Sequence, residues 1–216
     1  MHPDFPHFIV VEGPIGVGKT SLARRLADDL QTEILLEEPE DNPFLERFYE
    51  DPRGAALPTQ LHFLMQRVRQ LKELRQGDMF RPVRIADFLI EKDRLFAQLT
   101  LDEDELELYN QVYANMTLDA PAPDLVVYLQ APVPVLLERI ARRARTYERD
   151  IDTGYLQRLS DAYATFFYHY DAAPLLIVNA ADADFVNHDA DYGRLLDQIR
   201  TVRGGRHYFN PLPFAM

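Results

Sequence analysis

The residues with the clearest chemistry form a glycine-rich stretch near the start of the chain, Gly13-Pro14-Ile15-Gly16-Val17-Gly18-Lys19-Thr20. The stretch fits the phosphate-binding loop pattern of glycine, four residues, glycine, lysine and then serine or threonine. In such a loop the glycines let backbone N–H groups converge on phosphate oxygens, and the dipole of the following helix adds positive potential. Lys19 is expected to reach the β- and γ-phosphates of a nucleotide, and the Thr20 hydroxyl to bind Mg²⁺. The stretch therefore predicts a nucleoside triphosphate site.

The segments on either side of this loop supply the context that such a loop requires. Residues His7 to Glu12 form an apolar run typical of a buried parallel strand. Downstream, the segment from Ser21 to Leu30 has leucines at four-residue spacing, which is one face of an amphipathic helix. The alternative is a glycine turn that matches the pattern by chance, and the flanking strand and helix weaken it. Ser21, the first residue of that helix, completes the expected ATP-binding set.

Acidic residues end two further predicted strands. The strand at residues 33–38 delivers Glu37 and Glu38 to its carboxyl end, and the strand at residues 82–86 ends at Asp87. Ligands of open α/β sheets bind at the carboxyl ends of the strands, so Glu38 and Asp87 are expected to lie beside the phosphate-binding loop. Taken alone, one acid at such a position is more often a solvated strand terminus.

Arginines gather around one predicted helix, although the chain as a whole is acidic. The helix spans residues 134–145, and the cluster consists of Arg139, Arg142, Arg143, Arg145 and Arg149. Charges of one sign repel one another unless an anion compensates them, and a triphosphate is a suitable anion. We therefore interpret residues of about 142–150 as a lid that closes arginines over a transferring phosphate. The alternative is an ordinary solvated helix face.

The rest of the chain alternates strands with helices. Helices are predicted over residues 44–50, 58–75, 88–99, 102–116, 155–170 and 192–202, strands over 124–129 and 175–178, and a turn over 51–54. This order predicts one α/β domain over residues 1–216, with a five-stranded parallel sheet flanked by helices on both faces. Gln60 and Arg67 are seven residues apart on one predicted helix and share a face, which can line a pocket or border an amphipathic stripe.

The composition limits the partners and the compartment. The chain has 216 residues and a mass of 25.0 kDa, which suits one domain. A net charge of −12 and a pI near 4.9 argue against a nucleic-acid polymer or an anionic membrane as partner. Cysteine is absent, which excludes disulfides and thiolate metal sites. The sequence shows neither a signal-peptide pattern nor an apolar run of the ~20 residues needed to span a bilayer, so a cytoplasmic protein is expected.

Taken together, these segments resemble the deoxynucleoside kinase family, and especially the bacterial deoxyguanosine and deoxyadenosine kinases. The resemblance rests on residues 12–20 (EGPIGVGKT), 38–50 (EPEDNPFLERFYE), 85–88 (IADF), 92–97 (KDRLFA) and 139–148 (RIARRARTYE). These stretches occur in the right order over almost the whole chain. The resemblance implies a P-loop nucleoside-kinase fold with an arginine-rich lid, and ATP- and Mg²⁺-dependent 5′-phosphorylation of deoxynucleosides in nucleotide salvage. It also implies a homodimer packed through helices.

The resemblance further implies roles at individual positions. Glu38 corresponds to the acid that contacts the nucleoside 5′-hydroxyl and acts as general base. Asp87 corresponds to a catalytic acid near the 5′-oxygen, where it shares Mg²⁺ with Thr20. Tyr49 and Glu148 correspond to the pair that binds the 3′-hydroxyl of the deoxyribose.

The remaining implied roles concern the base and the phosphates. Gln60, Arg67 and Asp93 correspond to the trio that recognises the base edge, and such side chains can pair bidentately with a purine. The ATP phosphates are assigned to the phosphate-binding loop, with Lys19 as a catalytic residue, and to the lid arginines Arg139, Arg143 and Arg145.

One stretch departs from the family pattern. Where the family's Asp/Glu-Arg-Ser motif has arginine and serine, this chain has Phe88 and Leu89, so a positive charge expected beside the reacting oxygen is missing. Bacterial deoxyguanosine kinases resemble this chain in having an aromatic residue after the acid. This similarity favours the purine substrates deoxyguanosine, deoxyadenosine or both.

Two other functions stay open at this point. A nucleoside monophosphate kinase, such as thymidylate kinase, shares the loop and an arginine lid but needs basic residues for the acceptor phosphate. The acceptor-side residues here, among them Glu37 and Tyr49, are acidic or neutral. A regulatory nucleotide switch that binds guanine would carry an Asn-Lys-x-Asp signature, and the sequence has none.

Overall fold

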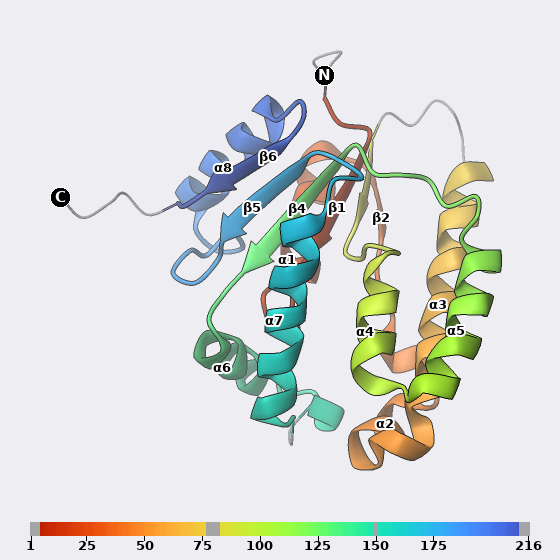
Figure 1. Cartoon of the computed structure of the whole chain (residues 1–216). Helices are drawn as coiled ribbons and strands as arrows, with labels where there is room; N and C mark the ends of the chain where they lie inside the picture. The colour runs from red at the N-terminus through yellow and green to blue at the C-terminus, as the bar shows by residue number, and fades with distance from the viewer. Residues whose placement is uncertain (1–4, 77–82, 149–150, 212–216) are drawn as a thin grey trace.

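Short and mainly apolar runs form the strands, which all pair in parallel within one sheet (Figure 1). The computed structural model describes residues 5–76, 83–148 and 151–211. Across the sheet the strands are β2 (Glu33–Leu35), β3 (Arg84–Ala86), β1 (Phe8–Glu12), β4 (Leu125–Gln130), β5 (Leu175–Asn179) and β6 (Arg206–Phe209). The central strands β3, β1 and β4 are almost entirely buried, as expected for a parallel sheet that is covered on both faces.

Helices cover both faces of the sheet, which confirms the predicted α/β fold. They are α1 (Lys19–Leu30), α2 (Leu45–Glu50), α3 (Pro52–Gln76), α4 (Lys92–Thr100), α5 (Glu103–Met116), α6 (Val133–Arg143), α7 (Thr153–His169) and α8 (Asp189–Thr201), with short 3₁₀ turns η1 (Pro39–Asp41) and η2 (Thr146–Glu148). On one face, Tyr128 of β4 stacks on Phe167 of α7 with the ring centroids 4.0 Å apart. On the other face, α1 packs against β1 and is joined to α8 by Arg25, which lies over the Tyr192 ring.

The order of the strands creates a crevice next to β1. β1 lies between β3 and β4. After β1 the chain adds β2 and β3 on one side of it, and later adds β4 on the other side. The loop at residues 13–18 therefore opens at the carboxyl ends of the central strands, which is the usual ligand position in open α/β sheets. In Figure 1 the strand arrows point toward the end of the molecule where α2 and α6 lie.

The sheet has one strand more than the five predicted from the sequence. β6 pairs with β5 at the edge of the sheet, with Arg206 opposite Leu175 and Phe209 opposite Val178. Most of β6 is exposed, and Arg206 donates to the carbonyl oxygen of Tyr168 at 2.8 Å. An exposed edge strand needs no apolar run, so hydrophobic patterning could not reveal it.

The predicted turn at residues 51–54 is wrong, because α3 begins at Pro52. Proline is tolerated in the first turn of a helix, where its missing N–H would have no intrahelical partner. Ala55 and Ala56 follow as fully buried helix formers that pack against Leu45 and Phe48 of α2. Tertiary packing thus overrides the turn signal of the Asp-Pro-Arg-Gly sequence.

Other limits also differ from the predictions. β2 ends at Leu35, three residues before the predicted end, and α4 begins at Lys92 rather than at Phe88. Residue 82 of the predicted third strand lies outside the described residues. So do residue 149 of the arginine cluster and residues 149 and 150 of the predicted lid. None of the described helices combines the length and the apolar character needed to cross a membrane.

Candidate active site

The loop after β1 has a backbone that requires glycine at two positions. Gly13 has φ +152° and Gly16 has φ +85°, which side-chain-bearing residues rarely adopt. A Cβ atom on Gly13 would lie 2.5 Å from the carbonyl oxygen of Leu129, and one on Gly16 would lie 2.8 Å from that of Leu136. Gly18 is the N-cap of α1, so the N-terminus of this helix faces the loop and favours a bound anion.

The first residues of α1 turn their polar groups toward the loop and toward β3. The Lys19 ammonium donates to the Gly13 carbonyl oxygen at 2.7 Å. The Thr20 hydroxyl donates to Asp87 Oδ2 at 2.5 Å, and Asp87 Oδ1 accepts from the backbone N–H of Glu37 at 2.7 Å. Burial raises the pKa of Asp87, and the charge of Glu37 adds to that effect. The structure thus brings Lys19, Thr20 and Asp87 together.

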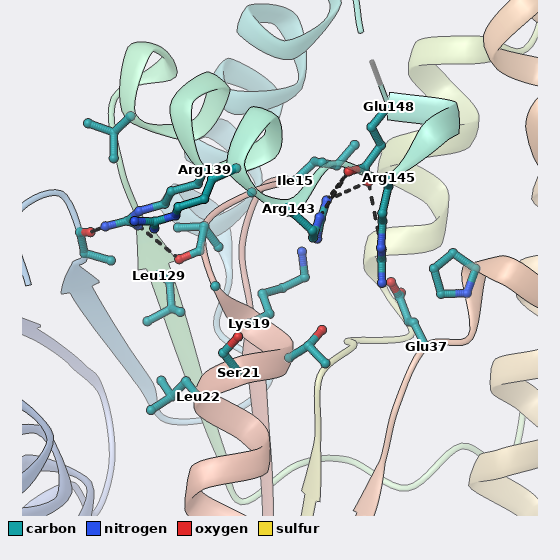
Figure 2. A pocket seen from close by; sticks show the side chains of 18 of the residues that line it. Ile15, Lys19, Ser21, Leu22, Glu37, Leu129, Arg139, Arg143, Arg145 and Glu148 are labelled. Atoms are coloured by element: carbon teal, nitrogen blue, oxygen red, sulfur yellow. Dashed lines mark hydrogen bonds and ion pairs between the residues drawn. The ribbon is translucent and has the colours of Figure 1, made fainter. Parts of the chain in front are cut away.

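One cavity of about 1080 Å³ joins the phosphate-binding loop to α2, α3 and the lid. Figure 2 shows Lys19 and Arg143 pointing into this space from α1 and from the end of α6. The predicted site residues that line it are Ile15, Gly16, Val17, Gly18, Lys19, Thr20, Ser21, Tyr49, Gln60, Arg67, Arg139, Arg143, Arg145 and Glu148. The predicted site residues that do not line it are Gly13, Pro14, Glu38, Asp87 and Asp93.

Of the two adjacent glutamates, Glu37 faces the cavity, and Glu38, the predicted general base, does not line it. Glu38 is exposed and lies outside the cavity wall. Glu37 lines the cavity, and its Oε1 lies 2.5 Å from Arg67 Nη2 and 2.5 Å from Lys92 Nζ. Because β2 ends at Leu35, both glutamates lie in the irregular segment after it, where neighbouring side chains take different directions. Ion pairs with Arg67 and Lys92 hold the Glu37 carboxylate toward the cavity.

Two cations keep Glu37 in its charged form. Burial opposes ionisation, but Arg67 and then Lys92 outweigh it, so the pKa of Glu37 falls well below its usual range. Burial also opposes the charge of Lys92, yet the attraction of Glu12 and Glu37 raises the pKa of that ammonium. The cavity therefore contains an ionised carboxylate that can accept a hydrogen bond from a substrate hydroxyl.

The predicted base-binding residues meet at the wall between α3 and α4. The Arg67 guanidinium bonds Glu37 on one side and Asp93 on the other. Asp93 is 1% exposed and lies behind Arg67, and no described residue hydrogen-bonds to its Oδ2 atom. Gln60 is 4% exposed and lines the cavity seven residues before Arg67 on α3. The structure thus pairs Arg67 with Asp93 and places Gln60 and Arg67 at the cavity surface.

The buried Asp93 gives the protein a specific pH dependence of stability. Burial raises its pKa from 3.8 to about 7, against the opposing effect of Arg67. A carboxyl with a raised folded-state pKa contributes stability below its unfolded pKa and loses it as the pH rises through the folded value. The wild-type protein should therefore lose stability relative to Asp93→Asn between about pH 4 and about pH 7. Thermal unfolding of both proteins across this range checks the prediction, and a constant difference in Tm would contradict it.

The lid arginines are paired with acids. Arg143 Nη2 lies 2.6 Å from both carboxylate oxygens of Glu148. Arg145 lies 3.0 Å from Glu40 and 3.9 Å from Glu148 (Figure 2 shows the pairs with Glu148). α6 ends at Arg143, two residues before its predicted end, because Ala144 adopts the left-handed conformation with φ +55°. An incoming triphosphate can take over these cations from their acids.

Arg139 joins three parts of the site. Its guanidinium donates to the carbonyl oxygens of Val17 at 3.3 Å and Ala180 at 2.8 Å. These contacts connect α6 to the phosphate-binding loop and to the segment after β5. Its side chain lines the cavity, but its donors serve backbone carbonyls here, which fixes the position of the loop.

Tyr49 and Glu148, the predicted sugar-binding residues, lie next to the lid side chains. The rings of Tyr49 and Tyr147 lie 5.8 Å apart, and Tyr147 donates from its hydroxyl to Glu40 at 3.1 Å. Glu148 follows Tyr147, is 4% exposed and accepts from Arg143. Movement of the lid arginines would therefore change the surroundings of Tyr49 and Glu148.

Two charged residues of the site are absent from the sequence predictions. Glu12 is fully buried at the end of β1 and accepts from the backbone N–H groups of Gly13 and Leu89. Lys92 is 2% exposed and lies 3.5 Å from Glu12 and 2.5 Å from Glu37. Lys92 is therefore a buried positive charge between two carboxylates of the site. Their only sequence signal is position, since one directly precedes the phosphate-binding loop and the other directly precedes Asp93.

Comparison with known proteins agrees with this geometry. The family model described as Deoxynucleoside kinase matches residues 9–203, which is most of the chain. The chain belongs to the deoxynucleoside kinase family. It is therefore a kinase, as the resemblance of its motifs predicted.

The similarity covers nearly the whole chain and not the phosphate-binding loop alone. The deoxyguanosine kinase of Bacillus subtilis (strain 168) is 37% identical over 204 residues, which cover 90% of this chain and 97% of the relative. The deoxyguanosine kinase of Lactobacillus acidophilus is 32% identical over 88% of each chain. Among solved structures, deoxyadenosine kinase from M. mycoides with the products dCMP and a flexible dCDP bound has a TM-score of 0.78 at 25% identity. The match covers 89% of this chain and 98% of that chain.

Proposed function

We propose that this deoxynucleoside kinase transfers the γ-phosphoryl group of ATP to the 5′-hydroxyl of purine deoxynucleosides, as a salvage reaction in the cytoplasm. One cavity joins the phosphate-binding loop to the ionised Glu37 and to the wall formed by Gln60 and Arg67, and this arrangement carries the proposal. The relatives named deoxyguanosine and deoxyadenosine kinase support deoxyguanosine and deoxyadenosine as the preferred acceptors.

The acceptor end of the cavity suits a neutral hydroxyl better than a phosphate. Arg67 is paired with Glu37 and Asp93, and Lys92 is paired with Glu12 and Glu37. A nucleoside monophosphate would bring negative charge next to Glu37 while both nearby cations are already neutralised, which is unfavourable in a buried site. This pairing argues against a nucleoside monophosphate kinase.

Glu37 has the position to orient the attacking oxygen. Its carboxylate faces the same cavity as Lys19 and can accept a hydrogen bond from the 5′-hydroxyl. Phosphoryl transfer depends mainly on positioning and on charge stabilisation, so a carboxylate of low pKa can align the hydroxyl and take its proton as the new P–O bond forms. Lys19, with Arg143 and Arg145 released from their acids, would bind the phosphates.

The lid pairing suggests how the two substrates cooperate. When phosphates take over Arg143, Glu148 loses its partner and becomes free to accept a hydrogen bond from the 3′-hydroxyl of the deoxyribose. Tyr49 lies next to this position through its contact with Tyr147. We therefore assign Tyr49 and Glu148 to the sugar, in the lid-closed state.

The residues beside the phosphate-binding loop fit a magnesium ion. The Thr20 hydroxyl and the Asp87 carboxylate lie 2.5 Å apart and offer the oxygen ligands that Mg²⁺ prefers. No group of three metal-binding side chains is found among the described residues, which suits an ion that takes its other ligands from phosphates and water. Bound by Thr20 and Asp87, Mg²⁺ would neutralise charge on the transferring phosphate.

A homodimer is part of the proposal, and α3 and α5 are the candidate interface. These two helices pack against each other. Each exposes a large apolar side chain, since Met65 is 58% and Leu108 is 50% exposed. A second copy of the chain would cover them.

Steady-state kinetics with ATP, Mg²⁺ and each of the four deoxynucleosides tests the proposed function. We expect the highest kcat/KM with deoxyguanosine or deoxyadenosine, and no transfer to the corresponding monophosphates. Turnover of a monophosphate without turnover of any deoxynucleoside would overturn the proposal.

Gln60→Leu should change the ranking of the four deoxynucleosides. Leucine keeps the volume of Gln60 but removes the amide that can pair with a base edge, and an unpaired polar partner costs about 1–3 kcal/mol. Gln60 is a better test than Arg67, because removing Arg67 would leave the buried Asp93 without its ion-pair partner and Glu37 with Lys92 alone. The measurement is kcat/KM for all four substrates, with the exposed Gln157→Leu as matched control. An equal loss on every substrate would remove Gln60 from the base pocket.

A further inference from the structure

Lys92 is a charged side chain that is buried in the site. The chain has three lysines among its 23 lysine and arginine residues, and they differ sharply in environment. Lys72 is exposed on α3, and Lys19 belongs to the phosphate-binding loop. Lys92 is 2% exposed, with its ammonium between two carboxylates of the site. Burying an ammonium is costly unless acids compensate it.

The carboxylate behind Lys92 is firmly anchored. Glu12 Oε1 accepts from the Gly13 N–H at 2.8 Å and from the Tyr163 hydroxyl at 2.9 Å. Its Oε2 accepts from the Leu89 N–H at 2.8 Å and lies 3.5 Å from Lys92 Nζ. These contacts tie Glu12 to the loop, to α7 and to the turn before α4. Lys92 is thus held from the side away from the cavity by an acid that has no freedom to turn.

The carboxylate in front of Lys92 depends on it for charge balance. Glu37 follows the short edge strand β2, and within the described part of the chain its carboxylate forms ion pairs with cations of α3 and α4. Arg67 is shared between Glu37 and Asp93, so without Lys92 Glu37 would share its remaining ion-pair partner with Asp93, and Glu12 would lose its ion pair with Lys92. Lys19 and Asp87 are the other charged groups near Glu37.

We propose that Lys92 is a positioning residue for phosphoryl transfer: fixed by Glu12, its ammonium holds the Glu37 carboxylate in place, directed at the acceptor hydroxyl. This inference rests on the proposed function, because it needs a hydroxyl acceptor. This role supplies a cation at the acceptor end of a site whose residue 88 is the apolar Phe88.

The first test is the split between kcat and KM in Lys92→Met, which keeps the length of the side chain without its charge. A misdirected Glu37 should lower kcat for deoxyguanosine at least about tenfold, while KM for ATP should stay within about twofold because the phosphate-binding loop is untouched. Lys72→Met, at the exposed lysine, is the matched control and should keep the wild-type kcat and KM. An unchanged kcat in Lys92→Met would overturn the inference.

Chemical rescue gives a second test that does not depend on this variant folding. The chain has no cysteine, so Lys92→Cys can be alkylated at a single site in the denatured state and then refolded. Aminoethylation restores an ammonium of nearly the original length, whereas carboxamidomethylation adds a neutral group of similar size. We expect the aminoethylated protein to regain most of the wild-type kcat and the neutral adduct to keep the lowered kcat.

The outcomes separate this inference from the proposed function. If the wild-type protein phosphorylates no deoxynucleoside, the proposed function fails first. If the wild-type protein is active and both adducts show the same kcat, the charge of Lys92 has no part in positioning Glu37. If only the aminoethylated protein folds, Lys92 serves the fold, and the inference is overturned as well.

Discussion

Glu37→Gln is expected to lower the single-turnover rate of deoxyguanosine phosphorylation by a factor on the order of 10²–10⁴, the usual contribution of a positioned general base. Glutamine keeps an oxygen that can accept from Arg67 and Lys92, so the local packing should survive. It cannot take the proton of the 5′-hydroxyl. Nucleoside affinity should fall much less than the rate, because an amide can still hydrogen-bond to the hydroxyl.

Rapid-quench kinetics and calorimetric binding of deoxyguanosine together measure these two effects. Glu38→Gln is the matched control, since Glu38 is the adjacent glutamate but is exposed and outside the cavity. We expect its rate and affinity to equal those of the wild type. If Glu37→Gln lost binding but kept its chemical rate, Glu37 would only hold the substrate, and Asp87 would become the better candidate for the base.

Lys19→Ala should abolish detectable transfer while leaving the fold intact. Among the described residues, the Lys19 ammonium hydrogen-bonds to two carbonyl oxygens of its own loop, so little of the core depends on it. Its proposed contact is with the β- and γ-phosphates, where charge develops during transfer. Loss of one such donor costs a factor on the order of 10²–10³ in kcat, and loss of a full charge should cost more.

Circular dichroism and thermal unfolding verify that the Lys19→Ala protein is folded before its turnover is measured. Lys72→Ala serves as control, because Lys72 is an exposed lysine on α3. A folded Lys19→Ala protein with near-normal turnover would rule out the phosphate role of this loop.

The distinction between Glu37 and Glu38 shows where prediction from sequence stops. Both residues follow a predicted strand, and both carry the same functional group. Which of them faces the cavity depends on where β2 ends and on two cations that come from α3 and α4. Those cations lie 30 and 55 residues away from Glu37 in the sequence. A local sequence pattern therefore cannot predict which glutamate faces the cavity.

The same limit applies to charges that pair across elements. In the sequence, Lys92 is one charged residue in a helix, where a solvated position is the ordinary expectation. Only the packing of α4 against α3 and α7 turns its side chain between Glu12 and Glu37. The pairing of Arg145 with Glu40 is likewise a contact between segments that are distant in the chain.

The sequence by itself determined the features that neighbouring residues encode: the phosphate-binding loop, the alternation of strands and helices, and membership of the deoxynucleoside kinase family. Such features follow from local backbone preferences and from hydrophobic periodicity, and both depend on residues that are close together in the sequence. Only the tertiary structure decided the exposed edge strand β6, the inward glutamate and the buried lysine. These depend on strand pairing, on burial and on charge balance between distant segments, because a side chain's environment is made by whatever packs against it.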